Sequence, residues 1–158
     1  MAEEIKVAQD LSRESKYEEL IPQLRSLIAG EPDLTANMAN VAAALKEVFG
    51  FFWVGFYVVK NGQLVLAPFQ GPVACTRIDF GKGVCGAAWK EGRTIMVPDV
   101  DDFPGHIACS PLSRSEIVVP IFAGEEVIGV LDIDSSRRDD FDKIDALYLK
   151  KIAAILKI

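Results

Sequence analysis

The sequence lacks the features of a membrane protein and of a nucleic-acid-binding protein. No apolar run approaches the roughly 18 residues that span a bilayer. Clustered positive charge is also missing: 17 Lys and Arg face 23 Asp and Glu, and only Arg137–Arg138 and Lys150–Lys151 form basic pairs. Acidic Glu3 and Glu4 stand where a signal peptide carries basic residues, and no apolar segment follows. We therefore expect a soluble, cytoplasmic protein that binds neither membranes nor nucleic acids.

Histidine and cysteine are scarce, which limits the sites that the chain can build. His106 is the only histidine, so an H-E-x-x-H motif is excluded. The three cysteines, Cys75, Cys85 and Cys109, are separated by 10 and 24 residues and form no C-x₂₋₄-C pair, so we expect no metal site. A reducing cytosol keeps structural disulfides open. A disulfide among these residues would therefore be transient and chemical.

Each of these residues also has a plain structural explanation. Cysteines are often buried as small apolar residues, and this suits Cys75 and Cys85 as well as a chemical role does. Cys109 lies in a polar, proline-interrupted loop with little core to join, which favours a reactive thiol there. His106, three residues earlier, would form a Cys-His dyad if it reached that thiol, whereas local hydrogen bonding is the simpler interpretation.

Apolar periodicity predicts an α+β fold and a single domain over residues 1–158. We expect a helical hairpin over about 14–49, a sheet core over about 51–135 and a C-terminal helix over about 140–157. Half of the residues are apolar, so a chain of this length buries an ordinary hydrophobic core. The sequence contains no internal repeat and no low-complexity segment.

Glycine, proline and aspartate set the expected boundaries of these elements. Gly30 and Gly50 should end the two helices of the hairpin, Asp33 should cap the second, and Asp139 or Asp140 should lie near the cap of the last helix. The expected strands are 52–59 and 63–67, joined by a type I′ turn at Asn61-Gly62, then 73–78, 94–97, 115–122 and 126–134, with a short helix at 84–91. The stretch 98–114 is long for a structureless loop, which is typical of functional loops.

Three acidic residues fall on the last two expected strands. Glu116 opens one strand, and Asp132 and Asp134 stand two residues apart on the next, so the two aspartates share one face of the sheet. Like charges on one face disfavour a strand unless its end is solvated. Alternatively, the three carboxyl groups converge on a pocket, where they would bind an ammonium group and one would donate a proton. Aromatic Trp53, Phe56 and Tyr57 would belong to the core or to the pocket wall.

Six ordered motifs span nearly the whole chain. They are Trp53-Val54-Gly55-Phe56-Tyr57, Gly71-Pro72-Val73-Ala74-Cys75-Thr76-Arg77-Ile78, Gly81-Lys82-Gly83-Val84-Cys85-Gly86, Gly105-His106-Ile107-Ala108-Cys109, Ser115-Glu116-Ile117-Val118 and Gly129-Val130-Leu131-Asp132-Ile133-Asp134-Ser135. Together these motifs resemble the free methionine-(R)-sulfoxide reductases, enzymes built on a GAF domain. The resemblance implies a six-stranded antiparallel sheet with the N- and C-terminal helices on one side and the substrate pocket on the other.

The same resemblance implies roles for individual residues. Cys109 would be the nucleophile, Cys75 the principal resolving thiol and Cys85 an alternative one. Glu116, Asp132 and Asp134 would hold the substrate's ammonium and polarise its sulfoxide, and Trp53 and Tyr57 would line the pocket. Glu116 and Asp134 are the candidate proton donors, because an expelled oxygen must be protonated. The substrate would be free methionine sulfoxide. The chain would need no cofactor, with thioredoxin and NADPH supplying electrons.

Two other functions fit the same pattern. A GAF-type sensory module that binds a small molecule would explain the fold but not the three thiols and three acids. A thiol redox sensor without turnover would also form a Cys75–Cys109 disulfide, so only catalytic turnover separates it from an enzyme. The apolar faces of the terminal helices suggest a homodimer, although packing onto the protein's own sheet would account for them equally well.

Overall fold

The computed structural model describes residues 4–156 of the chain. Residues 1–3 and 157–158, at the ends of the expected domain and of its last helix, lie outside the described part. The helices are α1 (Arg13–Ile28), α2 (Leu34–Phe49), α3 (Gly83–Glu91), the 3₁₀ helix η1 (Val100–Asp102) and α4 (Lys143–Ile155). The strands are β1 (Trp53–Lys60), β2 (Gln63–Gln70), β3 (Arg77–Asp79), β4 (Ile95–Val97), β5 (Ser115–Ala123) and β6 (Glu126–Ser135).

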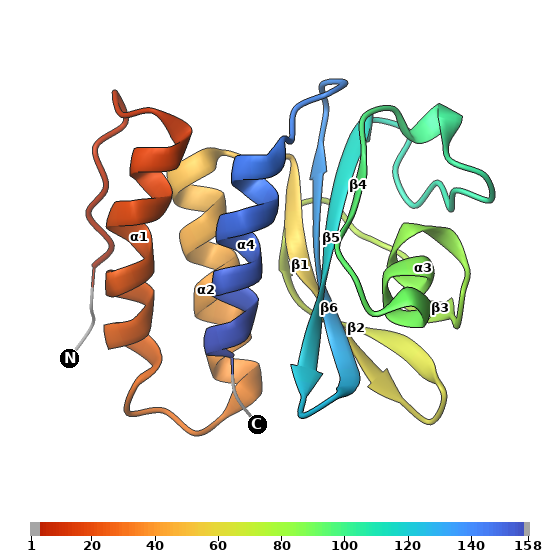
Figure 1. The fold of residues 1–158 in the computed structure, drawn as a ribbon, viewed down its shortest axis with the longest axis horizontal. Helices are drawn as coiled ribbons and strands as arrows, with labels where there is room; N and C mark the ends of the chain where they lie inside the picture. Colours follow the sequence, from red (N-terminus) through yellow and green to blue (C-terminus); the bar gives the residue numbers. More distant parts are fainter. Residues whose placement is uncertain (1–3, 157–158) are drawn as a thin grey trace.

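The six strands form one antiparallel sheet in the order β3-β2-β1-β6-β5-β4 (Figure 1). The hairpin between β1 and β2 turns at Asn61 and Gly62, whose φ angles of 50° and 79° are those of the expected type I′ turn. The centre of the sheet pairs β1 with β6 and β6 with β5, so residues on these three strands meet across short distances. The α+β class and the strand arrangement expected from the resemblance are confirmed.

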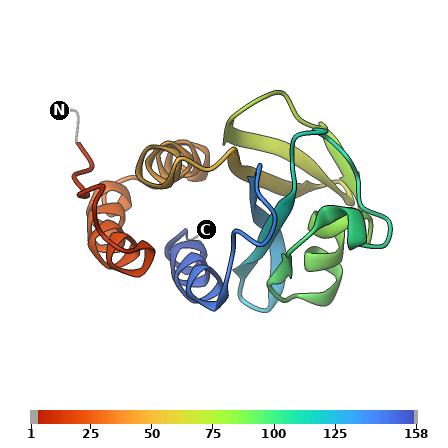
Figure 2. The same ribbon diagram turned by 90° about the horizontal axis from the view of Figure 1, so that it is seen from above.

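Helices cover both faces of this sheet, but unequally. Figure 2 shows α2 and α4 between the sheet and α1, which forms the outermost layer. The larger apolar core fills the space between these three helices and the sheet, and it includes Leu131 and Ile133 of β6. A smaller apolar cluster lies on the opposite face, under α3 and the 98–114 loop (Figure 1). The side chains that alternate with Leu131 and Ile133 therefore point toward this second, thinner layer.

The apolar faces of the terminal helices are buried within the chain itself. Tyr17 of α1 stacks on Tyr148 of α4 with ring centroids 5.3 Å apart. The Tyr17 hydroxyl also donates a 2.7 Å hydrogen bond to Asp145, which is fully buried. Packing onto the protein's own layers thus accounts for these faces, and a homodimer stays a prediction. Among the described residues, no helix is both long and apolar enough to cross a bilayer.

Some expected boundaries differ from those in the structure. The strand expected at 73–78 is β3 at Arg77–Asp79, and the strand expected at 63–67 runs on to Gln70 as β2. Helix α1 ends at Ile28 with Ala29 as its C-cap, before Gly30.

The N-cap of α4 is Asp142, in a reciprocal capping box with Asp145. Asp139 and Asp140 lie just before this cap, as expected. The Asp140 carboxylate forms a salt bridge with Arg13, whose Nη2 lies 3.2 Å from Asp140 Oδ1.

Candidate active site

A pocket opens on the sheet face that lies opposite the three packed helices. Its floor is formed by side chains of β1, β5 and β6, and its walls come from α3, the segment before β3 and the 98–114 loop. The lining includes all but one of the site residues expected from the sequence: Trp53, Tyr57, Cys85, Cys109, Glu116, Asp132 and Asp134. The remaining one, Cys75, directly follows lining residue Ala74. The structure therefore brings the expected residues together in one place.

Two of the three cysteines form a disulfide at this pocket. Cys75 and Cys109 are bonded, with their Cα atoms 5.4 Å apart across 34 residues of sequence. The bond ties the 98–114 loop to the segment that leads into β3. Both cysteines are partly exposed, so a second protein can approach the bond. The third cysteine, Cys85, is a free thiol in the first turn of α3 and is only 3% exposed.

The three acidic side chains lie on the pocket floor because of strand register. Glu116 of β5 pairs with Asp134 of β6, and Asp132 lies two residues before Asp134 on the same face. Glu116 and Asp132 are only 6% and 5% exposed, and Asp134 is half-buried. A solvated strand end is therefore the wrong explanation for these acids, since α3 and the 98–114 loop cover them.

Burial and mutual repulsion raise the pKa values of all three carboxyl groups. Burial, reinforced by the charge of Asp134, raises the pKa of Glu116 to about 8. Burial also raises the pKa of Asp132 well above its ordinary range, with Glu116 adding to the effect. The pKa of Asp134 is raised for the same reason, with Asp132 as its repelling neighbour. A site of this kind can donate a proton at neutral pH and favours a cationic ligand.

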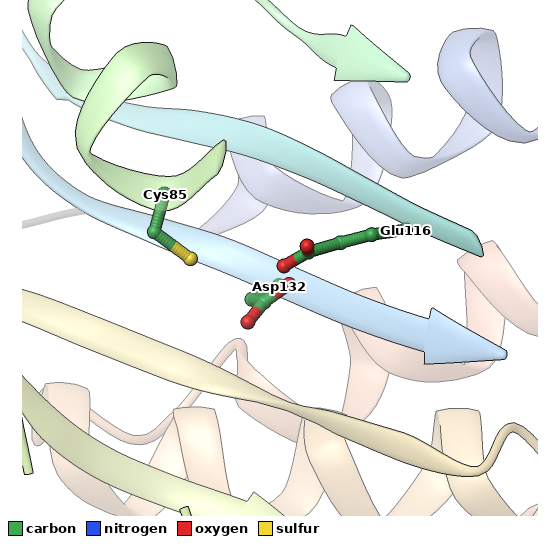
Figure 3. A group of neighbouring side chains, drawn as sticks. All are labelled: Cys85, Glu116 and Asp132. Atoms are coloured by element: carbon green, nitrogen blue, oxygen red, sulfur yellow. The ribbon is translucent and has the colours of Figure 1, made fainter. Parts of the chain in front are cut away.

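The Cys85 thiol faces this acidic group. Figure 3 shows Cys85 on α3 and Glu116 and Asp132 on neighbouring strands, with their side chains pointing toward one another. Burial raises the pKa of the Cys85 thiol, and the charge of Asp132 adds to the effect. Cys85 is thus buried, as the simple apolar explanation expected, but among ionisable groups. A thiol held in its neutral form is a weak nucleophile.

Aromatic residues of β1 support the wall that carries Cys75. The Trp53 indole stacks on Phe69 with centroids 5.2 Å apart, and its Nε1 donates a 3.0 Å hydrogen bond to the Pro72 carbonyl. The Tyr57 hydroxyl donates a 2.9 Å hydrogen bond to the Cys75 carbonyl. These two bonds fix the backbone at Pro72 and at Cys75. Phe56, by contrast, lies in the main core on the other face.

Gly55 explains why the Trp53-to-Tyr57 motif contains a glycine. A Cβ built at this position would lie 2.3 Å from the Phe69 Cβ and 2.8 Å from the Trp53 ring. No side chain fits between these groups, so the stacking of Trp53 on Phe69 requires glycine here.

Two polar residues of the site were not predicted. The side chain of His106 lies beside the acids, with its Nε2 3.7 Å from Glu116 Oε1. Burial lowers the pKa of His106, which keeps the imidazole neutral near pH 7. Ser113 is 7% exposed, and its Oγ has no hydrogen-bond partner among the described residues. Only the closeness of His106 to Cys109 in the sequence pointed to either residue.

Known proteins match this chain over nearly its full length. A family model described as the GAF domain matches residues 31–158. The GAF domain-containing protein A of Dictyostelium discoideum is 56% identical over 157 residues, which cover 99% of each chain. The free methionine-R-sulfoxide reductase of Escherichia coli (strain K12) is 42% identical over 142 residues, which cover 89% of this chain and 86% of that one.

A solved structure agrees with these sequence matches. The X-ray structure of the free methionine-R-sulfoxide reductase from Neisseria meningitidis, in complex with its substrate, is 56% identical to this chain. It superposes with a TM-score of 0.93 over 97% of this chain and 93% of that one. With the disulfide and the buried acids already located, these matches show that the chain is a GAF-domain protein that belongs to the free methionine-R-sulfoxide reductase family.

Proposed function

We propose that this protein reduces free L-methionine (R)-sulfoxide to methionine and is recycled by thioredoxin. The observation that carries the proposal is the Cys75–Cys109 disulfide beside a pocket floored by three buried carboxyl groups. In a reductase of this kind the disulfide is the oxidised form that remains after one turnover. The cycle needs a reducing compartment, which agrees with the cytoplasmic location expected from the sequence.

The reaction begins at Cys109. Its thiolate attacks the sulfoxide sulfur, and the oxygen is transferred to leave methionine and a Cys109 sulfenic acid. The sulfoxide oxygen must be protonated as the sulfur–oxygen bond breaks. Glu116 suits this step because a carboxyl group with a pKa of about 8 still carries its proton at pH 7. Asp134, whose pKa is also raised, is the second candidate donor.

The second step forms the disulfide. The Cys75 thiol attacks the sulfenic sulfur of Cys109, which releases water and joins the two residues. Their Cα separation of 5.4 Å in the bonded form supports Cys75 as the principal resolving residue. Cys85 is the alternative, but its buried thiol and raised pKa make it the poorer nucleophile. Thioredoxin then reduces the disulfide by thiol exchange.

The acids also explain why the substrate should be the free amino acid. Asp132 Oδ1 is buried and has no hydrogen-bond partner among the described residues. An α-ammonium group would satisfy this oxygen and offset the crowding of carboxyl groups. A peptide nitrogen carries no charge, so peptide-bound methionine sulfoxide would leave the acids unpaired. Trp53 and Tyr57 would bound the side of the same pocket.

A thioredoxin-coupled NADPH oxidation assay with four substrates tests this function. The substrates are free and peptide-bound methionine sulfoxide, each as the R and the S epimer. We expect turnover on the free R epimer alone. Absence of turnover on all four, with the thiols confirmed as reduced, would contradict the proposal and would favour a ligand-binding GAF sensor in which Cys109 is at most a redox switch.

A further inference from the structure

Three donor groups from separate elements converge in the pocket. The Cys85 Sγ and one carboxylate oxygen each from Glu116 and Asp132 all lie within 4.8 Å of one another (Figure 3). They come from α3, β5 and β6, so the packing of the helix on the sheet sets their positions. All three residues are buried, which shields the group from bulk water.

A second observation is that one carboxylate oxygen of the three donor residues lacks a hydrogen-bond partner. Asp132 is only 5% exposed, yet its Oδ1 has no hydrogen-bond partner among the described residues. A buried oxygen without a partner destabilises the folded protein. Glu116, Asp132 and Asp134 also crowd three carboxyl groups on one face of the sheet. The unpartnered oxygen and this crowding both favour a positively charged ligand.

The donor chemistry selects the kind of cation. Magnesium and calcium take oxygen donors, whereas a thiolate together with carboxylates suits zinc and similar divalent ions. A nitrogen donor also lies nearby, because His106 Nε2 is 3.7 Å from Glu116 Oε1. Sulfur, oxygen and nitrogen donors within one small pocket match the mixed ligand sets of four-coordinate zinc.

We propose that Cys85, Glu116 and Asp132 bind one zinc-type divalent ion in the substrate-free pocket. The ion would displace the Cys85 thiol proton as the sulfur–metal bond forms. Of the three cysteines whose spacing predicted no metal site, only Cys85 belongs to this set, and the other two donors are acids. Because the ion would occupy the place of the substrate's ammonium, ion and substrate exclude one another. That exclusion rests on the proposed function, whereas the binding itself does not.

Cobalt(II) titration of the oxidised protein tests the binding. Cobalt(II) substitutes for zinc, and coordination by a thiolate gives a charge-transfer absorption band. With Cys75 and Cys109 in the disulfide, Cys85 is the only thiol that can produce the band. We expect a saturable band at one equivalent of cobalt, abolished by zinc. Absence of the band, or a band without saturation, would overturn the proposal.

Variants then identify the ligands. Cys85→Ser keeps the shape of the side chain but should lose the band, and Asp132→Asn should weaken cobalt binding at least about tenfold. Glu91→Gln is the matched control, because Glu91 is an exposed acid at the far end of the same helix. It should leave the titration unchanged. A band that persists in Cys85→Ser, or an Asp132→Asn titration equal to wild type, would overturn the assignment of ligands.

Competition separates the two proposals. Free methionine (R)-sulfoxide added to the cobalt-loaded protein should remove the band at concentrations that saturate the substrate site. A band that forms normally but resists the substrate would overturn the mutual exclusion while leaving the metal site in place. Failure of the turnover assay would contradict the proposed function without affecting the cobalt band of the oxidised protein.

Discussion

Glu116 should make the stability of this protein strongly dependent on pH. Its pKa is about 8 in the folded protein against an ordinary value of 4.5. Between these two values the folded state keeps a proton that the unfolded state releases, so stability falls as pH rises. The contribution of protonated Glu116 to the free energy of unfolding is fully present below about pH 4.5 and is lost as pH rises through 8. The shift in its pKa corresponds to roughly 5 kcal/mol of stability over this window, and the free energy of unfolding falls by at most about 1.4 kcal/mol per pH unit.

Replacing Glu116 by Gln isolates this contribution. The Gln side chain stays neutral at every pH. The slope of the free energy of unfolding against pH should therefore decrease by the amount that corresponds to about one bound proton. Asp132 and Asp134 remain, and their raised pKa values leave a residual slope of the same sign. The slope of the variant should therefore be smaller than that of wild type but not zero.

Urea unfolding of the oxidised protein at a series of pH values between about 5 and 8 measures this difference. The disulfide stays intact throughout, so both proteins unfold from and to the same covalent state. Glu91→Gln, at an exposed position, serves as the control and should follow the wild-type curve. Parallel curves for wild type and Glu116→Gln would show that Glu116 is ionised in the folded protein and would refute the reasoning.

Further substitutions test the other parts of the site. Cys75→Ser should still release about one methionine per reduced chain but should not cycle with thioredoxin, and full cycling would transfer the resolving role to Cys85. Asp132→Asn should raise the KM for free methionine sulfoxide about 10- to 100-fold, because a hydrogen bond to a charged group contributes about 1.5 to 3 kcal/mol; an unchanged KM would remove Asp132 from ammonium binding. Leu112, which is 60% exposed, lies three residues from Cys109. Leu112→Glu should raise the KM for thioredoxin several-fold and leave turnover with a small dithiol unchanged, whereas equal losses with both reductants would argue against a role of Leu112 in docking thioredoxin.

The sequence predicted the parts of the fold that depend on local patterns. Period-two alternation placed Asp132 and Asp134 on one sheet face, and the structure puts Leu131 and Ile133 on the other. The Asn61-Gly62 turn follows from the φ angles that these residue types tolerate. Such features are set by a few neighbouring residues, so the sequence alone was sufficient for them.

Features that depend on distant contacts could not be predicted in the same way. The burial of Glu116 and Asp132 results from α3 and the 98–114 loop folding over the sheet, and the raised pKa values follow from that cover. His106 reaches Glu116 only because the same loop is folded back onto the pocket. Alternation alone left the strand-end acids equally compatible with solvent, and the family resemblance favoured the pocket. The extent of the domain over all 158 residues stays a prediction.

The measurement that tests the central claim most directly is a single turnover of fully reduced protein with free methionine (R)-sulfoxide, without any added reductant. Methionine release and the disulfides of the protein are measured together, for wild type and for Cys109→Ser. The account predicts about one methionine per wild-type chain, accompanied by the Cys75–Cys109 disulfide, and none from the variant. Appreciable methionine release by Cys109→Ser, or release by wild type with both thiols still free, would contradict it.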